Sequence, residues 1–196
     1  MAEKVLDKHI RESLHDYLRN DVAKAPGAVV IDELVLQGKD GRADVAVVND
    51  SFHCYEIKSD ADTLDRLKRQ IRVYGKVFDY LSVVVTEKHF DKAVKALPAY
   101  WGTYIWYPKE VFVSAPKVVE MRAPTLNQLS DKTSLTQLLW RDTALTLLRE
   151  VGAEKGVTSK PKWFLWKHIQ NTCTYPQVHK AVMDQYKTHR RNVEIS

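Results

Sequence analysis

Two carboxylates and a lysine are spaced so that pairing of two short strands would bring them together. The runs 41–48 and 52–58 are rich in strand-forming residues, and the three residues between them have the composition of a turn. If the runs pair as a hairpin, Asp44 lies across from Glu56 and close to Lys58. Two acids and an ammonium group suit a hard divalent cation and a positioned water, which is the chemistry of phosphodiester hydrolysis.

The strand setting of these charges favours a site over a surface ion pair. Side chains alternate along a strand, so Glu56 and Lys58 share one face and Ile57 takes the other. Asp44 is flanked by Ala and Val residues, and a charge that points inward from such a strand is costly unless it is paired or bound to metal. The spacing alone is common, and the alternative is two surface strands that carry an exposed salt bridge.

Glu33 is a third candidate carboxylate, in the middle of the apolar run 28–36 that precedes the hairpin. Asp32 has the opposite facing on a regular strand, so we expect only one of the two acids to face the site. Glu33 is interpreted either as a metal ligand or ligand-orienting group, or as an exposed strand acid.

The hydrophobic pattern predicts the elements that position these residues. Apolar residues at helical spacing indicate a helix over 6–18, a helix that opens at 59–62 and continues to Phe78, and a helix over 89–97. Strands are expected at 28–36, 43–49, 52–58, 80–86, 103–107 and 111–113. The order helix, three strands, helix, strand, helix, strand predicts an α/β fold with a mixed central sheet flanked by helices.

The strand signal ends near residue 121. Regions 126–148 and 163–190 are expected to be helical, with Pro176 dividing the second. We therefore predict a core over 1–120 and a helical appendage over 121–196. Residues 155–196 hold eight Lys and Arg against two acids, a local charge of +6, while the whole chain carries +5. Such a basic segment attracts phosphate backbones, although a solvated surface would have the same composition.

The composition excludes several classes of protein. No apolar run approaches the roughly 18 residues of a membrane span, and residues 1–5 lack a signal-peptide core, so no membrane partner is expected. Cys54 and Cys173 fit no zinc or redox spacing, which predicts a reduced, cytoplasmic protein. The seven histidines form no zinc motif, and neither a Gly-rich phosphate loop nor a serine nucleophile elbow is present.

The helix after Lys58 adds residues that could position a substrate. Gln70 and Tyr74 are four apart and share a helical face, among Arg66, Arg69 and Arg72. With Glu33, Asp44 and Glu56-Ile57-Lys58 on successive strands before it, this Gln-x-x-x-Tyr element resembles the RecB-like branch of the PD-(D/E)XK nuclease superfamily. The resemblance covers roughly residues 1–115, and Ala43 replaces the Pro of the name. The runs 42–48, 55–60 and 139–142 resemble more closely a largely uncharacterised bacterial and phage family of this fold.

The resemblance implies a restriction-endonuclease-like αβββαβ core and a metal-dependent deoxyribonuclease. Asp44, Glu56 and the carbonyl of Ile57 would bind Mg²⁺ or Mn²⁺, and Lys58 would orient the attacking water and neutralise charge on the phosphate. Glu33 would hold a water or a second ion. Gln70, Tyr74 and Arg42 are candidates for substrate positioning. A nuclease that cuts both strands would suit a homodimer.

The appendage supplies candidate nucleic-acid contacts: Lys167, Lys180, Arg190 and Arg191. Trp163 and Trp166 lie among these bases, as in proteins that clamp single strands, but we expect both to pack the appendage against the core. Two other functions remain open, because one fold serves many activities. One is a non-catalytic DNA-binding module that keeps the nuclease fold. The other is a protein-interaction module whose charged strand residues form only salt bridges.

Overall fold

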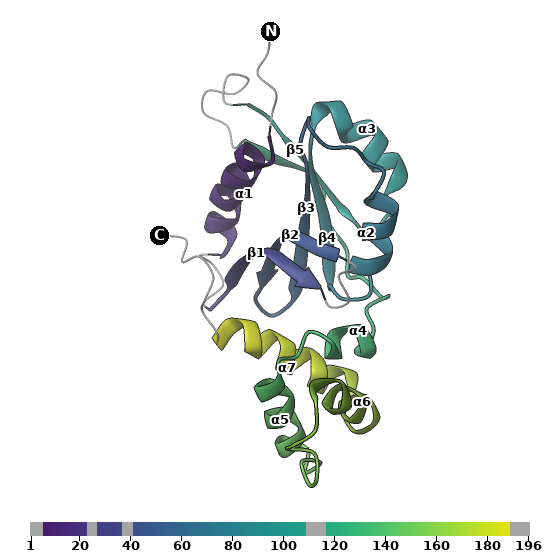
Figure 1. The fold of residues 1–196 in the computed structure, drawn as a ribbon. Helices are drawn as coiled ribbons and strands as arrows, with labels where there is room; N and C mark the ends of the chain where they lie inside the picture. Colours follow the sequence, from purple (N-terminus) through teal and green to yellow (C-terminus); the bar gives the residue numbers. More distant parts are fainter. Residues whose placement is uncertain (1–5, 23–26, 37–40, 109–116, 189–196) are drawn as a thin grey trace.

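A six-stranded mixed sheet forms the centre of the protein (Figure 1). The computed structural model describes residues 6–22, 27–36, 41–108 and 117–188. The strands in these ranges are β1 (Val29–Leu36), β2 (Gly41–Val48), β3 (Phe52–Lys58), β4 (Tyr80–Thr86), β5 (Gly102–Trp106) and β6 (Val118–Arg122). The helices are α1 (Asp7–Val22), α2 (Leu67–Tyr74), α3 (Glu87–Ala96), α4 (Lys132–Thr136), α5 (Arg141–Glu150), α6 (Lys162–Thr172) and α7 (Tyr175–Thr188).

The strands lie in the sheet in chain order, from β1 to β6. β1, β2 and β3 are antiparallel, β3, β4 and β5 are parallel, and β6 returns antiparallel to β5. The two parallel connections pass through α2 and α3, as parallel pairing requires a crossover. The predicted α/β fold with a mixed sheet is therefore confirmed.

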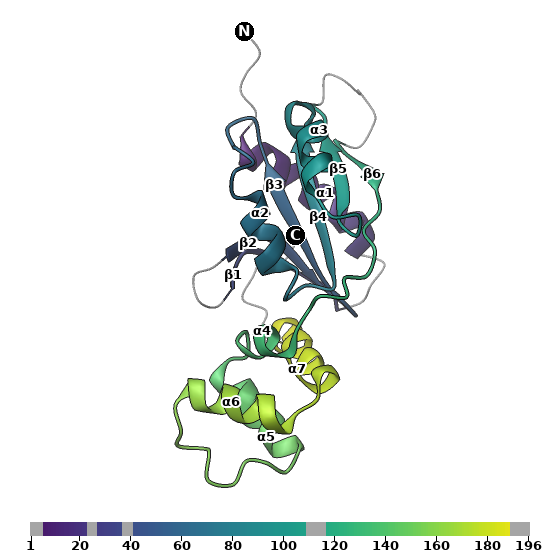
Figure 2. The same cartoon turned by 90° about the vertical axis from the view of Figure 1, so that its right-hand side faces the viewer.

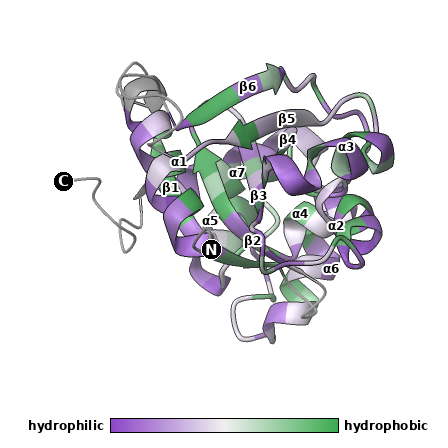
Figure 3. Cartoon of the chain, turned by 90° about the horizontal axis from the view of Figure 1, so that it is seen from above, coloured by the Kyte–Doolittle hydropathy of each residue, from purple (hydrophilic) through white to green (hydrophobic). Residues whose placement is uncertain are grey.

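Apolar residues cover both faces of the sheet, so the central strands are buried on two sides. On one face α1 packs Ile10, Leu14 and Leu18 against strand residues such as Val45 and Ile57. On the other face α2 and α3 cover a larger cluster that continues into the helices of the C-terminal region. Figure 3 shows hydrophobic residues gathered along the strands and long hydrophilic stretches on α1 and α3. This two-sided burial explains why β4 is buried at every position after Tyr80 and carries Leu or Val on both faces.

The C-terminal helices α4 to α7 pack beyond one end of the sheet (Figures 1 and 2). Tyr186 of α7 meets Phe52 with ring centroids 6.0 Å apart, next to the turn between β2 and β3. His179 pairs with Asp79 at 2.8 Å, and the Asp79 carboxylate also accepts a hydrogen bond from the main-chain N–H of Phe52. These contacts fix the helical region to the turn end of the hairpin, whereas Lys58 lies at the opposite end.

Most predicted elements agree with the structure, and three differ. The helix expected to open at 59–62 begins at Leu67, because the Asp62 carboxylate accepts hydrogen bonds from the N–H and hydroxyl of Ser59 and closes a turn instead. The sequence did not predict β6, and the predicted strand 111–113 lies outside the described residues. Residues 126–131 are not helical: the Asn127 side chain donates to the carbonyls of Gly75 and Phe78, which holds this segment against the core.

The structure also shows how the C-terminal region is divided. β6 ends at Arg122, two residues beyond the core predicted over 1–120. The helical region expected around Pro176 is two helices that separate at Cys173–Thr174, with Pro176 in the first turn of α7. No helix in the described ranges is long and apolar enough to cross a membrane.

Candidate active site

The hairpin of β2 and β3 brings the predicted charges together. Its antiparallel register pairs Val45 with Tyr55, so Asp44 and Glu56 occupy the next opposing positions. The carboxylate of Asp44 accepts a hydrogen bond of 2.8 Å from the main-chain N–H of Ile57. This bond places Asp44 beside both Glu56 and Lys58, as the sequence predicted.

Glu56 and Lys58 form a buried ion pair. Glu56 is 1% exposed and Lys58 is 4% exposed, and the ammonium lies 2.5 Å from Oε1 of Glu56. The amide of Gln70 donates to the same oxygen. The other carboxylate oxygen, Oε2 of Glu56, is buried without a hydrogen-bond partner among the described residues, and so is Oε1 of Gln70. A buried acceptor without a hydrogen-bond donor is costly, so Oε2 of Glu56 and Oε1 of Gln70 are available to a donor or a cation.

Asp44 carries a raised pKa, for reasons visible in the structure. Burial raises its pKa most, and the neighbouring negative charge of Glu56 raises it further. The Ile57 N–H and the Lys58 ammonium act in the opposite direction, and the net result is a pKa of about 7 against an ordinary 3.8. Two carboxylates held this close resist being ionised together, which is the electrostatic condition that a bound cation relieves.

Glu33 has a backbone conformation unusual for its residue type. Its φ is +55°, the only positive value for a non-glycine residue among those described. Ile31 before it and Leu34 after it belong to the same core cluster, although three residues apart on a strand they would normally face opposite ways. Glu33 therefore shifts the side-chain alternation of β1 by one residue, while the register with β2 is the same before it, at Asp32 and Val45, and after it, at Leu34 and Ala43, so no residue is inserted.

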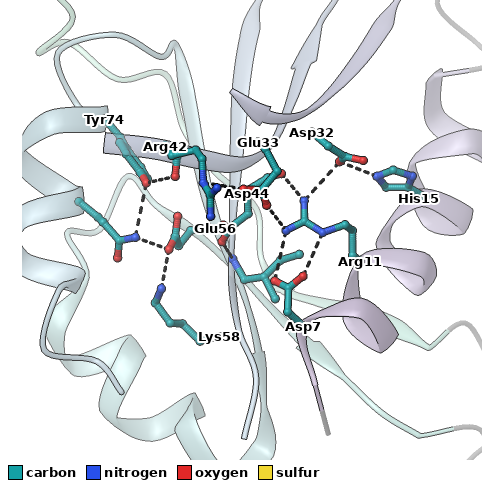
Figure 4. A network of polar contacts seen from close by, with 12 residues as sticks. Asp7, Arg11, His15, Asp32, Glu33, Arg42, Asp44, Glu56, Lys58 and Tyr74 are labelled. Atoms are coloured by element: carbon teal, nitrogen blue, oxygen red, sulfur yellow. Dashed lines mark hydrogen bonds and ion pairs between the residues drawn. The ribbon is translucent and has the colours of Figure 1, made fainter. Parts of the chain in front are cut away.

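Asp32 and Glu33 both reach Arg11, but only Glu33 lines the open cavity around Asp44 and Glu56, in agreement with the prediction that only one of the two acids faces the site. Arg11 comes from α1 and donates to Oε1 of Glu33 at 2.7 Å and to the main-chain carbonyl of Asp44 at 2.5 Å. It also lies 3.4 Å from Asp32 and 3.0 Å from Asp7. Figure 4 shows this guanidinium at the centre of the acids from α1 and β1.

The second oxygen of Glu33 pairs with Arg42 at 2.5 Å. Glu33 thus contacts two arginines, and the described structure shows no contact between it and Asp44 or Glu56. Sequence reasoning missed Asp7 and Arg11. Their only signal was an acid and a base four apart at the start of the first helix, a pattern typical of any solvated helix.

Tyr74 links α2 to β2. Its hydroxyl donates to the carbonyl of Arg42 at 2.7 Å and lies 3.4 Å from the Gln70 amide. Burial, with Glu56 nearby, raises the pKa of Tyr74 well above its usual range, so the hydroxyl keeps its proton. A side chain at Gly41 would come within 2.8 Å of the Tyr74 ring, which explains the glycine at the start of β2.

One open cavity of about 630 Å³ unites the predicted site residues. All eight line it: Glu33, Arg42, Asp44, Glu56, Ile57, Lys58, Gln70 and Tyr74. Asp7 and Arg11 add to its wall from α1, and Asp62, Arg66 and Arg69 add to it from the segment that leads into α2. The cavity therefore has acids at its base and several arginines around its opening.

The predicted nucleic-acid contacts of the helical region lie elsewhere. Lys167 is exposed on α6, and Lys180 on α7 pairs with Asp184. Neither lines the cavity, and Arg190 and Arg191 lie outside the described residues. Trp166 packs on the hydrophobic cluster, and its indole N–H donates to the carbonyl of Leu139 within the helical region itself. Trp163 is 62% exposed, so the expected packing against the core is not seen for it.

Comparison with known proteins identifies the family. The family model described as "Bacteriophage P4 protein cII" matches residues 1–193. Protein cII of Enterobacteria phage P4 is 30% identical over 95 residues, which are 48% of this chain and 36% of that protein. The match thus spans little more than a third of the length of this curated relative. No solved structure matches the chain significantly. The chain belongs to the bacteriophage P4 protein cII family.

Proposed function

We propose that this protein is a metal-dependent nuclease that hydrolyses phosphodiester bonds, with DNA as its substrate. One observation carries the proposal: a buried lysine and two carboxylates on adjacent strands face one open cavity, and Oε2 of Glu56 has no partner there. A fold that needed only a salt bridge at this position would satisfy both oxygens of the acid. A buried acceptor left open beside a lysine suits a site that receives a cation and a phosphate.

The order of elements supports a nuclease core of the PD-(D/E)XK type. Glu33, Asp44 and Glu56-Ile57-Lys58 lie on β1, β2 and β3, and the Gln70–Tyr74 pair lies on α2 directly after them. The elements α1, β1, β2, β3, α2 and β4 follow one another as the resemblance implies. Since a fold can serve unrelated activities, the residues of the site support the proposal more strongly than this order does.

The donor set fits Mg²⁺ or Mn²⁺. Asp44, Glu56 and the carbonyl of Ile57 would hold the ion, since hard cations prefer oxygen ligands and Mg²⁺ keeps several waters. The described residues contain no group of three His, Cys, Asp or Glu side chains that could bind a metal, so the protein would supply two carboxylates and one carbonyl. When bound, the ion acts as a Lewis acid on the phosphoryl oxygen.

The chain's own groups would do the remaining work. Lys58 holds its ammonium at the cavity, where it would orient the attacking water and neutralise charge on the phosphate. Gln70 fixes the Glu56 carboxylate, and Tyr74 fixes β2 through the carbonyl of Arg42. Glu33 would act chiefly through Arg11 and Arg42, which it orients around the opening.

Nucleic acid is the substrate class that the charges favour. Arg42, Arg66 and Arg69 surround the cavity, and residues 155–183 contain five lysines and no acid. Cations in this number favour a polyanion. In this proposal Lys167 and Lys180 contact nucleic acid away from the cut, and Arg190 and Arg191 are further candidate contacts. A cytoplasmic location and a homodimer remain predictions.

Cleavage of labelled single- and double-stranded DNA with Mg²⁺, Mn²⁺ or EDTA tests the proposal. Wild type is compared with Lys58→Ala and Asp44→Ala, and with Lys92→Ala on the exposed side of α3 as a matched control. We expect metal-dependent cutting that both site variants lose and the control keeps. DNA binding without cutting by folded wild type would support a binding module instead. Neither cutting nor binding would support an interaction module.

A further inference from the structure

A second, larger cavity adjoins the candidate active site. It has a volume of about 1390 Å³ and lies between α2 and the segment that contains α4. Figure 2 shows α2 directly above α4, and residues of both helices line the cavity. Arg69 lines both this cavity and the one that holds Asp44 and Glu56. The two spaces are therefore neighbours along the same helix.

One wall of this cavity is a row of cations. Arg69, Arg72 and Lys76 follow one another at i, i+3 and i+7 along α2 and the turn after it, so they lie on one side of the helix. Arg72 and Lys76 are exposed and form no ion pair with any acid in the part of the chain that the structure describes. The one acid in the lining, Asp131, accepts hydrogen bonds from Ser134 at the start of α4.

The rest of the lining is largely apolar. Ile71, Val77, Tyr100 and Leu138 contribute to it, and Leu129 is 62% exposed there. A double helix presents phosphates outward and keeps its base faces stacked on one another, so those faces cannot contact an apolar lining. An unpaired strand offers base faces to apolar and aromatic side chains as well as phosphates to the cations.

The dimensions also suit a single strand. Arg69 and Lys76 are seven residues apart, about 10 Å along a helix, a length that covers neighbouring phosphates of one extended strand. Pockets for drug-sized ligands measure roughly 300–1,000 Å³, so this cavity takes a few nucleotides but not a duplex.

We propose that this cavity, the α2 groove, binds an unpaired DNA strand next to the scissile phosphate, so that the substrate is single-stranded DNA or a duplex with an unpaired extension. That the neighbouring phosphate is the one cut rests on the proposed nuclease function, but binding of a strand in the α2 groove can be measured without cutting. The strand passes from the acids of the cavity, past Arg69, to Arg72 and Lys76.

Fluorescence anisotropy in EDTA measures binding without cleavage. The probes are a labelled DNA strand of about twelve nucleotides, within the site sizes common for single-strand binding, its blunt duplex, and duplexes with a 3′ or 5′ extension. The test variant is Arg72→Ala/Lys76→Ala. The control is Lys92→Ala/Lys95→Ala on α3, which removes two exposed cations with the same change of net charge.

We expect the single strand and one extended duplex to bind more tightly than the blunt duplex. Arg72→Ala/Lys76→Ala should weaken single-strand binding about tenfold or more, and should reduce the slope of log Kd against log salt by about 1.4, or 0.7 per lost phosphate contact. The control pair should change affinity less than about twofold. Leu129→Glu, at an exposed position that tolerates the change, should also weaken binding by placing an anion in the groove.

Equal losses in the test and control pairs, or blunt duplex bound as tightly as single strand, would overturn the inference. Cleavage separates it from the proposed function. If wild type binds through Arg72 and Lys76 but cuts no DNA, the α2 groove is a binding site and the proposed nuclease function is wrong. If wild type cuts DNA but Arg72→Ala/Lys76→Ala binds it with unchanged affinity, the nuclease function stands and the α2 groove is not a binding site.

Discussion

Replacing Asp44 by Asn should stabilise the metal-free protein. Burial and the charge of Glu56 raise the pKa of Asp44 from 3.8 to about 7. At about 1.36 kcal/mol per pH unit, keeping this carboxylate ionised in the fold costs on the order of 4 kcal/mol at neutral pH. Asn removes the charge and keeps an oxygen that can accept from the Ile57 N–H.

The expected gain is smaller than this figure. A hydrogen bond to a neutral amide is weaker than one to a carboxylate by about 1 kcal/mol, and the attraction between Asp44 and Lys58 is lost too. We expect a net gain of about 1–3 kcal/mol, and each kcal/mol raises the Tm of a chain of this length by roughly 2–4 °C. Urea and thermal unfolding in EDTA measure both quantities, with Asp91→Asn on the exposed side of α3 as the control.

The pH dependence gives the same prediction a second readout. Because the folded state holds the Asp44 proton more tightly than the unfolded chain, this group lowers stability as pH rises from about 4 to about 7, and its effect is constant above that. Asp44→Asn should remove this part of the pH dependence. Mg²⁺ should raise the Tm of wild type by neutralising the two acids, and should raise that of Asp44→Asn much less. A less stable variant, or equal effects of Mg²⁺ on both proteins, would refute the reasoning.

Three further predictions concern other parts of the structure. Lys58→Met should cost about 3–5 kcal/mol in urea unfolding, because it leaves Glu56 charged and buried; a loss below that of Lys92→Met would contradict a buried pair. Glu33→Gly and Glu33→Ala lose the same ion pairs, but Gly should be the more stable by about 1 kcal/mol, since only it adopts positive φ without strain; the reverse order would argue for a regular strand. Asp79→Ala should cost about 2–3 kcal/mol and make α7 more sensitive to protease, since it removes the partner of His179 and of a main-chain N–H; unchanged protease sensitivity would show that other contacts hold α7.

Much of the candidate site could be predicted because it is local in the sequence. Strand alternation and a three-residue turn are enough to place Asp44 opposite Glu56 and beside Lys58, and helical spacing is enough to pair Gln70 with Tyr74. These relations depend only on the repeat of one element or on one hairpin, so composition and spacing contain them.

The parts that could not be predicted depend on contacts between distant segments. Arg11 reaches Glu33 and Asp44 across the chain, and nothing near it in sequence marks it out from a solvated arginine. The left-handed backbone of Glu33 is imposed by its tertiary setting, since glutamate has no intrinsic preference for positive φ. The α2 helix starts late because the Asp62 carboxylate accepts hydrogen bonds from Ser59 and closes a turn that resembles a helix cap in sequence.

The packing of α7 against the turn of the β2–β3 hairpin has a consequence for biosynthesis. Phe52 and Asp79 are synthesised early. Tyr186, the partner of Phe52, follows it by more than a hundred residues, and His179, the partner of Asp79, follows it by 100 residues. At roughly 5–20 residues per second this interval lasts several seconds or more, during which one end of the sheet has no cover. A nascent chain that stalls before residue 175 would expose that apolar end, so the loss of helix α7 should favour aggregation over a smaller stable core.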